Sequence, residues 1–247
     1  MFELQTDLIF PVHAVPQAGP LPAHAKRLSV RTGDGETLEG IQIPAAVPDR
    51  SRTLILGFGG NAWNGQDVAE YLHQIYPGNA VTAFHYRGYR PSTGSPSGEA
   101  LIADAPLVYD AAVHEAEPSR VIGVGFSIGT GIAAQLSAKR KFDGIILVTP
   151  FDSLKAVAES LFAWVPIGPF FRHEIDAAGP LQQSHVPVAI IAAANDQIIP
   201  SARTEALRHV VKKLVYDCTI PRAGHNDIYG RSDFQDAMHE AMDRLKA

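Results

Sequence analysis

The chain has 247 residues, of which 46% are hydrophobic and 19% are charged, a composition typical of a globular protein with a sizeable core. Its net charge of −5 leaves no basic surplus to neutralise phosphates, which argues against nucleic-acid binding. The one cysteine, Cys218, excludes an internal disulfide and a cysteine-based zinc site, and we expect it to be a core residue of a strand.

The N-terminal segment lacks the pattern of a secretory signal. It carries Glu3 and Asp7 before Pro11, where a signal would have a basic start and then a long apolar run. No stretch approaches the roughly 18 apolar residues of a membrane-spanning helix. We therefore expect a cytoplasmic protein without a transmembrane segment, in which residues 1–25 wrap over the surface.

A hairpin is predicted next. Residues 27–31 and 37–43 alternate polar and apolar side chains, and Thr32-Gly33-Asp34-Gly35 between them is typical of a turn. Alternation of this kind indicates an antiparallel pair with one solvated face.

The rest of the chain alternates apolar runs with helical patterns. Continuous apolar runs are typical of parallel strands that are covered on both faces, and they occur at 54–56, 80–84, 121–124, 145–148, 188–191 and 214–216. Helices are expected at about 67–75, 101–115, 128–139, 201–211 and 233–245. This order predicts one α/β domain over 1–247, with a mostly parallel central sheet, helices on both faces and the hairpin at its N-terminal edge.

One connection is longer than a single helix requires. We interpret residues of about 151–185 as a helix from Leu154 to about Trp164 followed by a small cap insertion. Its aromatic residues Phe151, Trp164 and Phe170 are candidates for a substrate pocket. The alternative is that they pack the insertion onto the sheet.

The sequence Gly125-Phe126-Ser127-Ile128-Gly129 connects a buried strand directly to a helix. This context is typical of a nucleophile elbow, a strained turn that lifts a serine Oγ above the sheet. Side chains two residues before and after the serine would collide, which explains the two glycines. We predict that Ser127 is a nucleophile; the alternative is a glycine-rich turn that packs closely or binds phosphate.

A serine nucleophile requires a base and an acid that orients the base. Among the histidines after Ser127, we choose His225 because it lies in a loop after the last strand, where a base can reach Oγ. Asp196, after the 188–191 strand, is the predicted acid, and a turn or helix cap is its alternative role. Asp152, one strand earlier, is the rival acid, although we expect it to cap the helix that starts at Leu154.

The negative charge that develops on a substrate oxygen needs hydrogen-bond donors. We predict the backbone N–H groups of Ile128, at a helix start, and of Asn61, in the glycine-rich loop after the first buried strand. Ala62 is the second choice for the latter.

These motifs together resemble the Bem46-like group of α/β-hydrolases, which includes the ABHD13 and ABHD17 proteins and is often described as serine aminopeptidase-like. The resemblance extends from about Leu8 to the last helix and is carried by residues 32–35, 60–62, 86–89, 125–129, 195–200 and 224–227. It implies the α/β-hydrolase fold and a serine hydrolase.

The chain departs from the usual motifs of that group at three positions. Gly59 replaces a histidine, His85 replaces an aspartate, and Arg90 stands where a glycine is common. The departures concern the loops and leave the triad complete. Arg87, inside the motif at 86–89, is expected to form a structural ion pair.

We therefore predict a serine hydrolase that cleaves a carboxylic ester or thioester of a small-molecule acyl substrate through an acyl-enzyme, without metal or cofactor. Two alternatives stay open. One is a peptidase or amidase that uses the same triad, and the other is a catalytically silent binding protein on the same fold.

Overall fold

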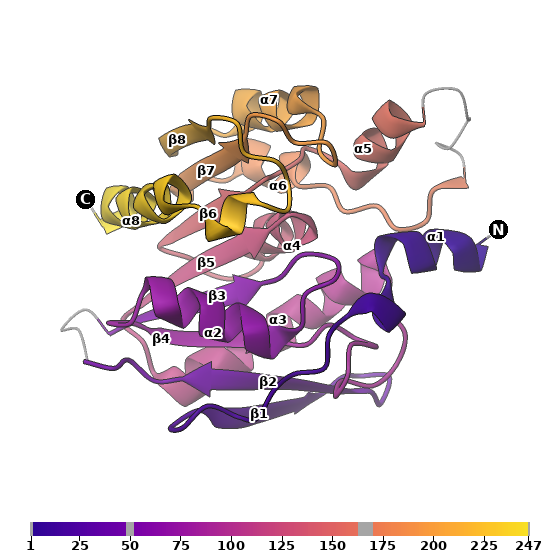
Figure 1. Ribbon diagram of the computed structural model, residues 1–247. Helices are drawn as coiled ribbons and strands as arrows, with labels where there is room; N and C mark the ends of the chain where they lie inside the picture. The colour runs from indigo at the N-terminus through magenta and orange to yellow at the C-terminus, as the bar shows by residue number, and fades with distance from the viewer. Residues whose placement is uncertain (1, 48–51, 163–169, 247) are drawn as a thin grey trace. The chain divides into compact units, whose positions relative to one another are not determined.

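The computed structural model describes residues 2–47, 52–162 and 170–246 (Figure 1). The chain divides into two compact units, Met1–Gly123 and Val124–Ala247. The division falls inside strand β5 (Arg120–Phe126), which begins in the first unit and ends in the second. That the whole chain is a single domain stays a prediction.

In the first unit the strand order is β1-β2-β4-β3. The hairpin is confirmed: β1 (Lys26–Arg31) pairs antiparallel with β2 (Thr37–Ile43), and β2 pairs antiparallel with β4 (Ala80–Phe84). β3 (Thr53–Phe58) runs parallel to β4. Figure 1 shows helix α2 (Gly65–Ile75) in front of these strands and α3 (Gly98–Ala116) behind them.

In the second unit the order is β5-β6-β7-β8. β6 (Gly144–Val148), β7 (Val188–Ala193) and β8 (Leu214–Ile220) are parallel. α8 (Ser232–Lys246) packs on β6, β7 and β8, and α4 (Ile128–Ser137) packs on β6 from behind (Figure 1). The other helices of this unit are α5 (Leu154–Leu161), α6 (Ala178–Gln183) and α7 (Ser201–Val210).

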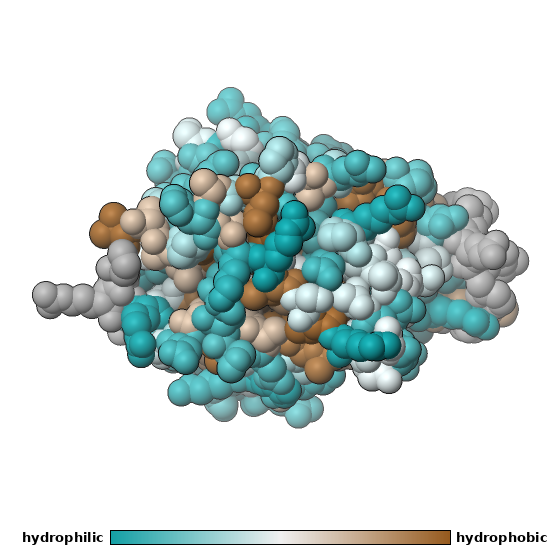
Figure 2. All heavy atoms as spheres, turned by 90° about the horizontal axis from the view of Figure 1, so that it is seen from below, coloured by the Kyte–Doolittle hydropathy of each residue, from teal (hydrophilic) through white to brown (hydrophobic). Residues whose placement is uncertain are grey.

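Burial along the strands follows the hydrophobic pattern of the sequence. Nearly every residue of β3, β5, β6 and β7 is buried, as predicted for strands that are covered on both faces. β1 is largely solvated. β8 is the exception to the pattern: of its seven residues only Ile220 is buried, and Cys218 is half-buried. The expectation that this strand is covered on both faces, with Cys218 in the core, was wrong, because β8 is the last strand in the order. Figure 2 shows the side on which β1 and β2 lie as mostly hydrophilic; charged side chains on an outer strand discourage pairing with another chain.

Two helices were not expected. Residues 2–9 form α1, where we expected a chain that wraps the surface; the helix ends just before Pro11, which cannot continue a helix. The insertion contains α6, whose start is stabilised by the carboxylate of Asp176, which accepts a hydrogen bond from Gly179 N at 2.9 Å. No helix of the described residues is long and apolar enough to cross a membrane.

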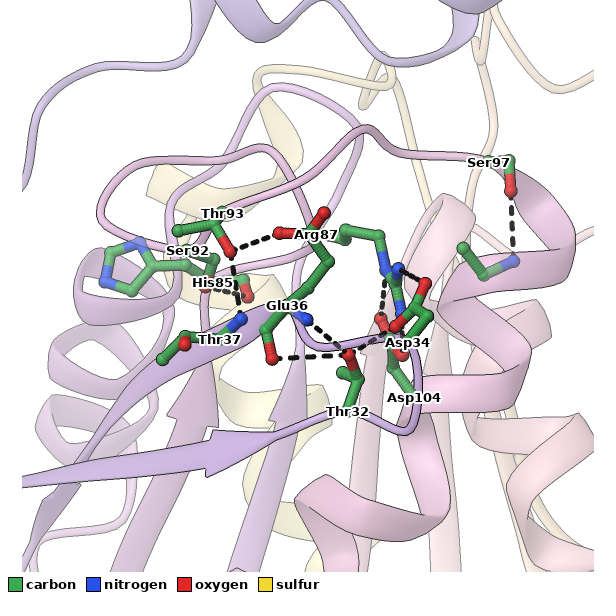
Figure 3. A network of polar contacts seen from close by, with 11 residues as sticks. Thr32, Asp34, Glu36, Thr37, His85, Arg87, Ser92, Thr93, Ser97 and Asp104 are labelled. Carbon is green, nitrogen blue, oxygen red and sulfur yellow. Dashed lines mark hydrogen bonds and ion pairs between the residues drawn. The ribbon is translucent and has the colours of Figure 1, made fainter.

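Arg87 forms the ion pair that the sequence predicts (Figure 3). Its guanidinium donates two hydrogen bonds to Asp104 (2.9 and 2.6 Å) and a third to Asp34 (2.5 Å). The hydrogen bond from Arg87 is the main reason why the pKa of Asp34 falls to about 2. The contact joins the β1–β2 turn, the loop after β4 and helix α3.

Replacing Arg87 with glutamine is expected to lower the free energy of unfolding by about 3–5 kcal/mol, because it leaves the buried Asp104 carboxylate uncompensated. Urea unfolding measures this loss. Lys26→Gln is the control, since it breaks an exposed ion pair with Glu115 that contributes at most about 1 kcal/mol. Equal losses in the two variants would contradict the structural role of Arg87.

Candidate active site

Ser127 lies between the end of β5 and the start of α4, with φ 50° and ψ −116°. A non-glycine residue rarely adopts this region, so the turn is strained. A Cβ added at Gly125 would lie only 2.5 Å from the Gly129 carbonyl oxygen, which confirms the steric reason for glycine there. Ser127 N donates to the carbonyl of Val148 at the end of β6 (2.9 Å), so the turn is anchored to the neighbouring strand.

The side chains of Ser127, His225 and Asp196 form a hydrogen-bonded row within the second unit. His225 Nε2 lies 3.0 Å from Ser127 Oγ, and His225 Nδ1 lies 2.8 Å from Asp196 Oδ2. The side chains of His225 and Asp196 are each only 8% exposed. A base within hydrogen-bond distance of a hydroxyl, with an acid on its far nitrogen, is the geometry that activates a serine.

The other carboxylate oxygen of Asp196 also accepts hydrogen bonds. Oδ1 accepts hydrogen bonds from the backbone N–H groups of Ile198 (2.8 Å) and Ile199 (2.7 Å). This contact also shows that the alternative role of Asp196, a turn-forming aspartate, is compatible with the row. One oxygen orders the loop after β7, and the second is left for the imidazole.

Two hydrogen bonds fix the loop that carries His225. The Asp227 carboxylate accepts from Gly224 N (2.5 Å), and the carbonyl of Ala223 accepts from Asn195 N (2.8 Å). The second bond connects the histidine loop to the residue before Asp196. The two loops are therefore fixed relative to each other by backbone contacts as well as by the imidazole.

Asp152 makes different contacts. Its carboxylate faces Arg203 at 3.4 Å, and its carbonyl accepts from the N–H groups of Ala177 and Ala178. The expectation that Asp152 caps α5 was wrong: Ser153 is the cap, and its Oγ accepts from Ala156 N at 3.1 Å. The helix begins one residue later than an Asp152 cap would require.

Sequence reasoning missed Thr149 and Tyr229. Thr149 follows β6, is buried and has a positive φ of 49°. Its hydroxyl donates a hydrogen bond to the Val148 carbonyl (2.8 Å), and the same carbonyl accepts from Ser127 N. Tyr229 packs edge-on against Phe126, with ring centroids 5.7 Å apart. Burial raises the pKa of Tyr229 to about 12, despite its hydrogen bond with Thr149. The position of Thr149 directly after a buried strand was the available signal.

The predicted oxyanion donors lie in different units. Ile128 opens α4 in the second unit. Asn61 lies in the first, where its carbonyl accepts from the Tyr89 hydroxyl and the carbonyl of Gly59 accepts from Tyr86 (2.8 Å). These tyrosines fix the peptides of the loop after β3. That Asn61 and Ile128 act together stays a prediction.

The proposed pocket residues have diverse environments. Phe151 is fully buried and packs with Val157 and Ile199, as the packing interpretation requires. Phe170 is 55% exposed, and Trp164 lies outside the described residues. Their assignment to a substrate pocket stays a prediction.

Comparison with known proteins identifies relatives that match most of the chain. Residues 109–236 match a family model described as serine hydrolase. An uncharacterised protein of Mycobacterium tuberculosis is 30% identical over 86% of this chain and 78% of its own length. Protein Bem46 of Schizosaccharomyces pombe is 26% identical over 92% of this chain and 82% of its own length.

The names of two further similar proteins state an activity. The lysophosphatidylserine lipase ABHD12 of Danio rerio is 29% identical over 61% of this chain and 45% of its own length. The solved structure of a Pyrococcus furiosus esterase superposes with a TM-score of 0.69 at 18% identity, over 94% of this chain and 97% of the esterase. The structural similarity to the esterase shows the α/β-hydrolase fold.

Proposed function

Because the chain belongs to the serine hydrolase family and to its Bem46-like group, within the α/β-hydrolase fold, we propose that it cleaves a carboxylic ester or thioester of a small acyl substrate with a Ser127–His225–Asp196 triad. The observation that carries the proposal is the placement of the His225 imidazole, 3.0 Å from Ser127 Oγ and 2.8 Å from Asp196 Oδ2.

In the proposed reaction His225 Nε2 takes the hydroxyl proton as Ser127 Oγ attacks the carbonyl carbon. Asp196 keeps the proton on Nδ1, so that Nε2 is the basic nitrogen, and stabilises the imidazolium that forms. The N–H groups of Ile128 and Asn61 donate to the oxyanion. His225 then protonates the leaving alcohol or thiol, and water cleaves the acyl-enzyme by the same route in reverse.

Matched substrates test the bond that is cleaved. We expect hydrolysis of an acyl p-nitrophenyl ester and of the corresponding acyl thioester, with much slower cleavage of the acyl p-nitroanilide. Faster cleavage of the anilide would favour the amidase alternative. Failure to cleave all three would favour a binding protein.

We infer the acyl-length preference from the small size of the predicted cap. Each methylene group that leaves water contributes about 0.8 kcal/mol, and Phe151, which could have lined a deep pocket, is fully buried. We therefore expect kcat/KM on p-nitrophenyl esters to peak at short to medium acyl chains and to fall for longer ones. The lipase activity in the name of the ABHD12 relative points towards longer chains.

Rates on a series from acetyl to palmitoyl esters, each below its micelle limit, check this expectation. A rate that still rises at the palmitoyl ester would show that the insertion forms a long acyl tunnel.

A further inference from the structure

The first unit contains a pocket of about 230 Å³. It is lined by residues of β1, β2 and α2, by the residues that follow β4 and by part of the N-terminal segment. Its charged and hydrogen-bonding side chains include Arg27, Glu39, Gln66, His85 and Arg90. None of them belongs to the proposed triad.

The strand register explains why three of these side chains meet. Arg27 lies opposite Ile41 in the β1–β2 pair, and Ser29 lies opposite Glu39. His85 continues β4 beyond its last residue, and its N–H donates to the Glu39 carbonyl (2.8 Å). Because side chains alternate between the faces of a strand, Arg27, Glu39 and His85 point to one face across three strands.

His85 supplies a hydrogen-bond donor from a largely buried ring. Its residue is 3% exposed, and its Nδ1 accepts from Gly65 N at 3.3 Å, so the proton of the neutral ring is on Nε2. Burial, with a smaller effect of the Arg27 charge, lowers the pKa of His85 to about 4, which keeps the ring neutral near pH 7. No described residue accepts a hydrogen bond from Nε2. Figure 3 shows the ring turned away from the Arg87 ion pair.

Two cations accompany this donor. Arg27 and Arg90 are both exposed, and in the described part of the chain neither has an ion pair or a side-chain hydrogen bond. Glu39 is the acidic residue of the lining, and its carboxylate accepts from Ser29 Oγ (2.9 Å). The lining is thus positive by one charge, in a chain whose net charge is −5. Guanidinium groups and an N–H donor are the partners that a carboxylate or phosphate prefers.

We propose that this pocket binds a compact oxyanion, the carboxylate or phosphate group of a small molecule, through Arg27, Arg90 and the Nε2–H of His85. The volume is below the roughly 300–1,000 Å³ of pockets for drug-sized ligands, so the ligand is small. The site is separate from the proposed hydrolase chemistry and does not depend on it.

Titrations with inorganic phosphate and with acetate, followed by NMR at constant ionic strength, test the proposal and distinguish the two oxyanions. We expect saturable shifts of the His85 Nε2–H and Arg90 Nε–H resonances with at least one of them. Arg27→Gln and Arg90→Gln should each raise Kd about tenfold, because each removes one charged hydrogen bond. Both side chains are exposed, so both variants should fold, and their unfolding temperatures check this.

Two further variants separate a site from general charge attraction. Arg31→Gln, on the same strand and face as Arg27, should leave Kd unchanged. Glu39→Gln should lower Kd, because it removes a repelling charge and keeps an acceptor for Ser29. The proposal is overturned if neither anion saturates the shifts, if Arg31→Gln weakens binding as much as Arg27→Gln, or if Glu39→Gln weakens it.

Discussion

Replacing Ser127 with alanine is expected to lower kcat/KM for ester hydrolysis by at least about 10³-fold. The change removes the Oγ atom that lies 3.0 Å from His225 Nε2. Alanine keeps the Cβ, and the backbone bonds that anchor the turn, such as the one from residue 127 to Val148, do not involve the hydroxyl. The fold should therefore survive the loss of activity, which circular dichroism and thermal unfolding can confirm.

Ser160→Ala is the matched control. Ser160 lies on the exposed side of α5, where its hydroxyl donates to the Ala156 carbonyl, and its removal should leave kcat/KM at the wild-type value. Wild-type turnover by a folded Ser127→Ala protein would exclude Ser127 as the nucleophile.

Asp196→Asn is expected to lower kcat by about 10⁴-fold, the size of the loss when the equivalent change traps the wrong histidine tautomer in a serine protease. The amide oxygen can still accept from Ile198 N and Ile199 N, so the loop after β7 should keep its structure. The effect should appear mainly in kcat, because Asp196 acts on the chemical step through His225.

Asp152→Asn is the counterpart, because Asp152 is the rival acid in the sequence. It weakens the contact with Arg203 and should lower stability more than turnover. Steady-state kinetics of both variants, with their unfolding temperatures, separate the two aspartates. If the Asp152→Asn protein were inactive and the Asp196→Asn protein active, the catalytic acid would be Asp152, which follows β6, and not Asp196.

Local patterns allowed much of the fold to be predicted from the sequence. The apolar runs of β3 to β7 and the alternating pattern of the hairpin allowed burial to be predicted, because side chains alternate between the two faces of a strand. The elbow at 125–129 is equally local, since the steric conflict at Gly125 involves only the next turn of chain. His225 and Asp196 could be chosen because each follows a strand at the edge where the elbow lies.

Features that depend on distant contacts were not predictable in this way. Thr149 and Tyr229 meet only when the loop after β8 returns to the end of β6. Arg27, Glu39 and His85 are brought together by pairing across three strands.

The cap of α5 is a local feature that was nevertheless predicted one residue too early. Asp152 and Ser153 are both good capping residues, and the choice between them depends on the backbone geometry.

Covalent labelling with a fluorophosphonate probe, read by mass spectrometry of the digested protein, tests the central claim most directly. Such a probe reacts with a serine that a neighbouring base activates. We predict one adduct, on the peptide that contains Ser127, which is lost in Ser127→Ala and strongly slowed in Asp196→Asn. A protein that stays unlabelled, or an adduct on another serine that persists in Ser127→Ala, would contradict the account.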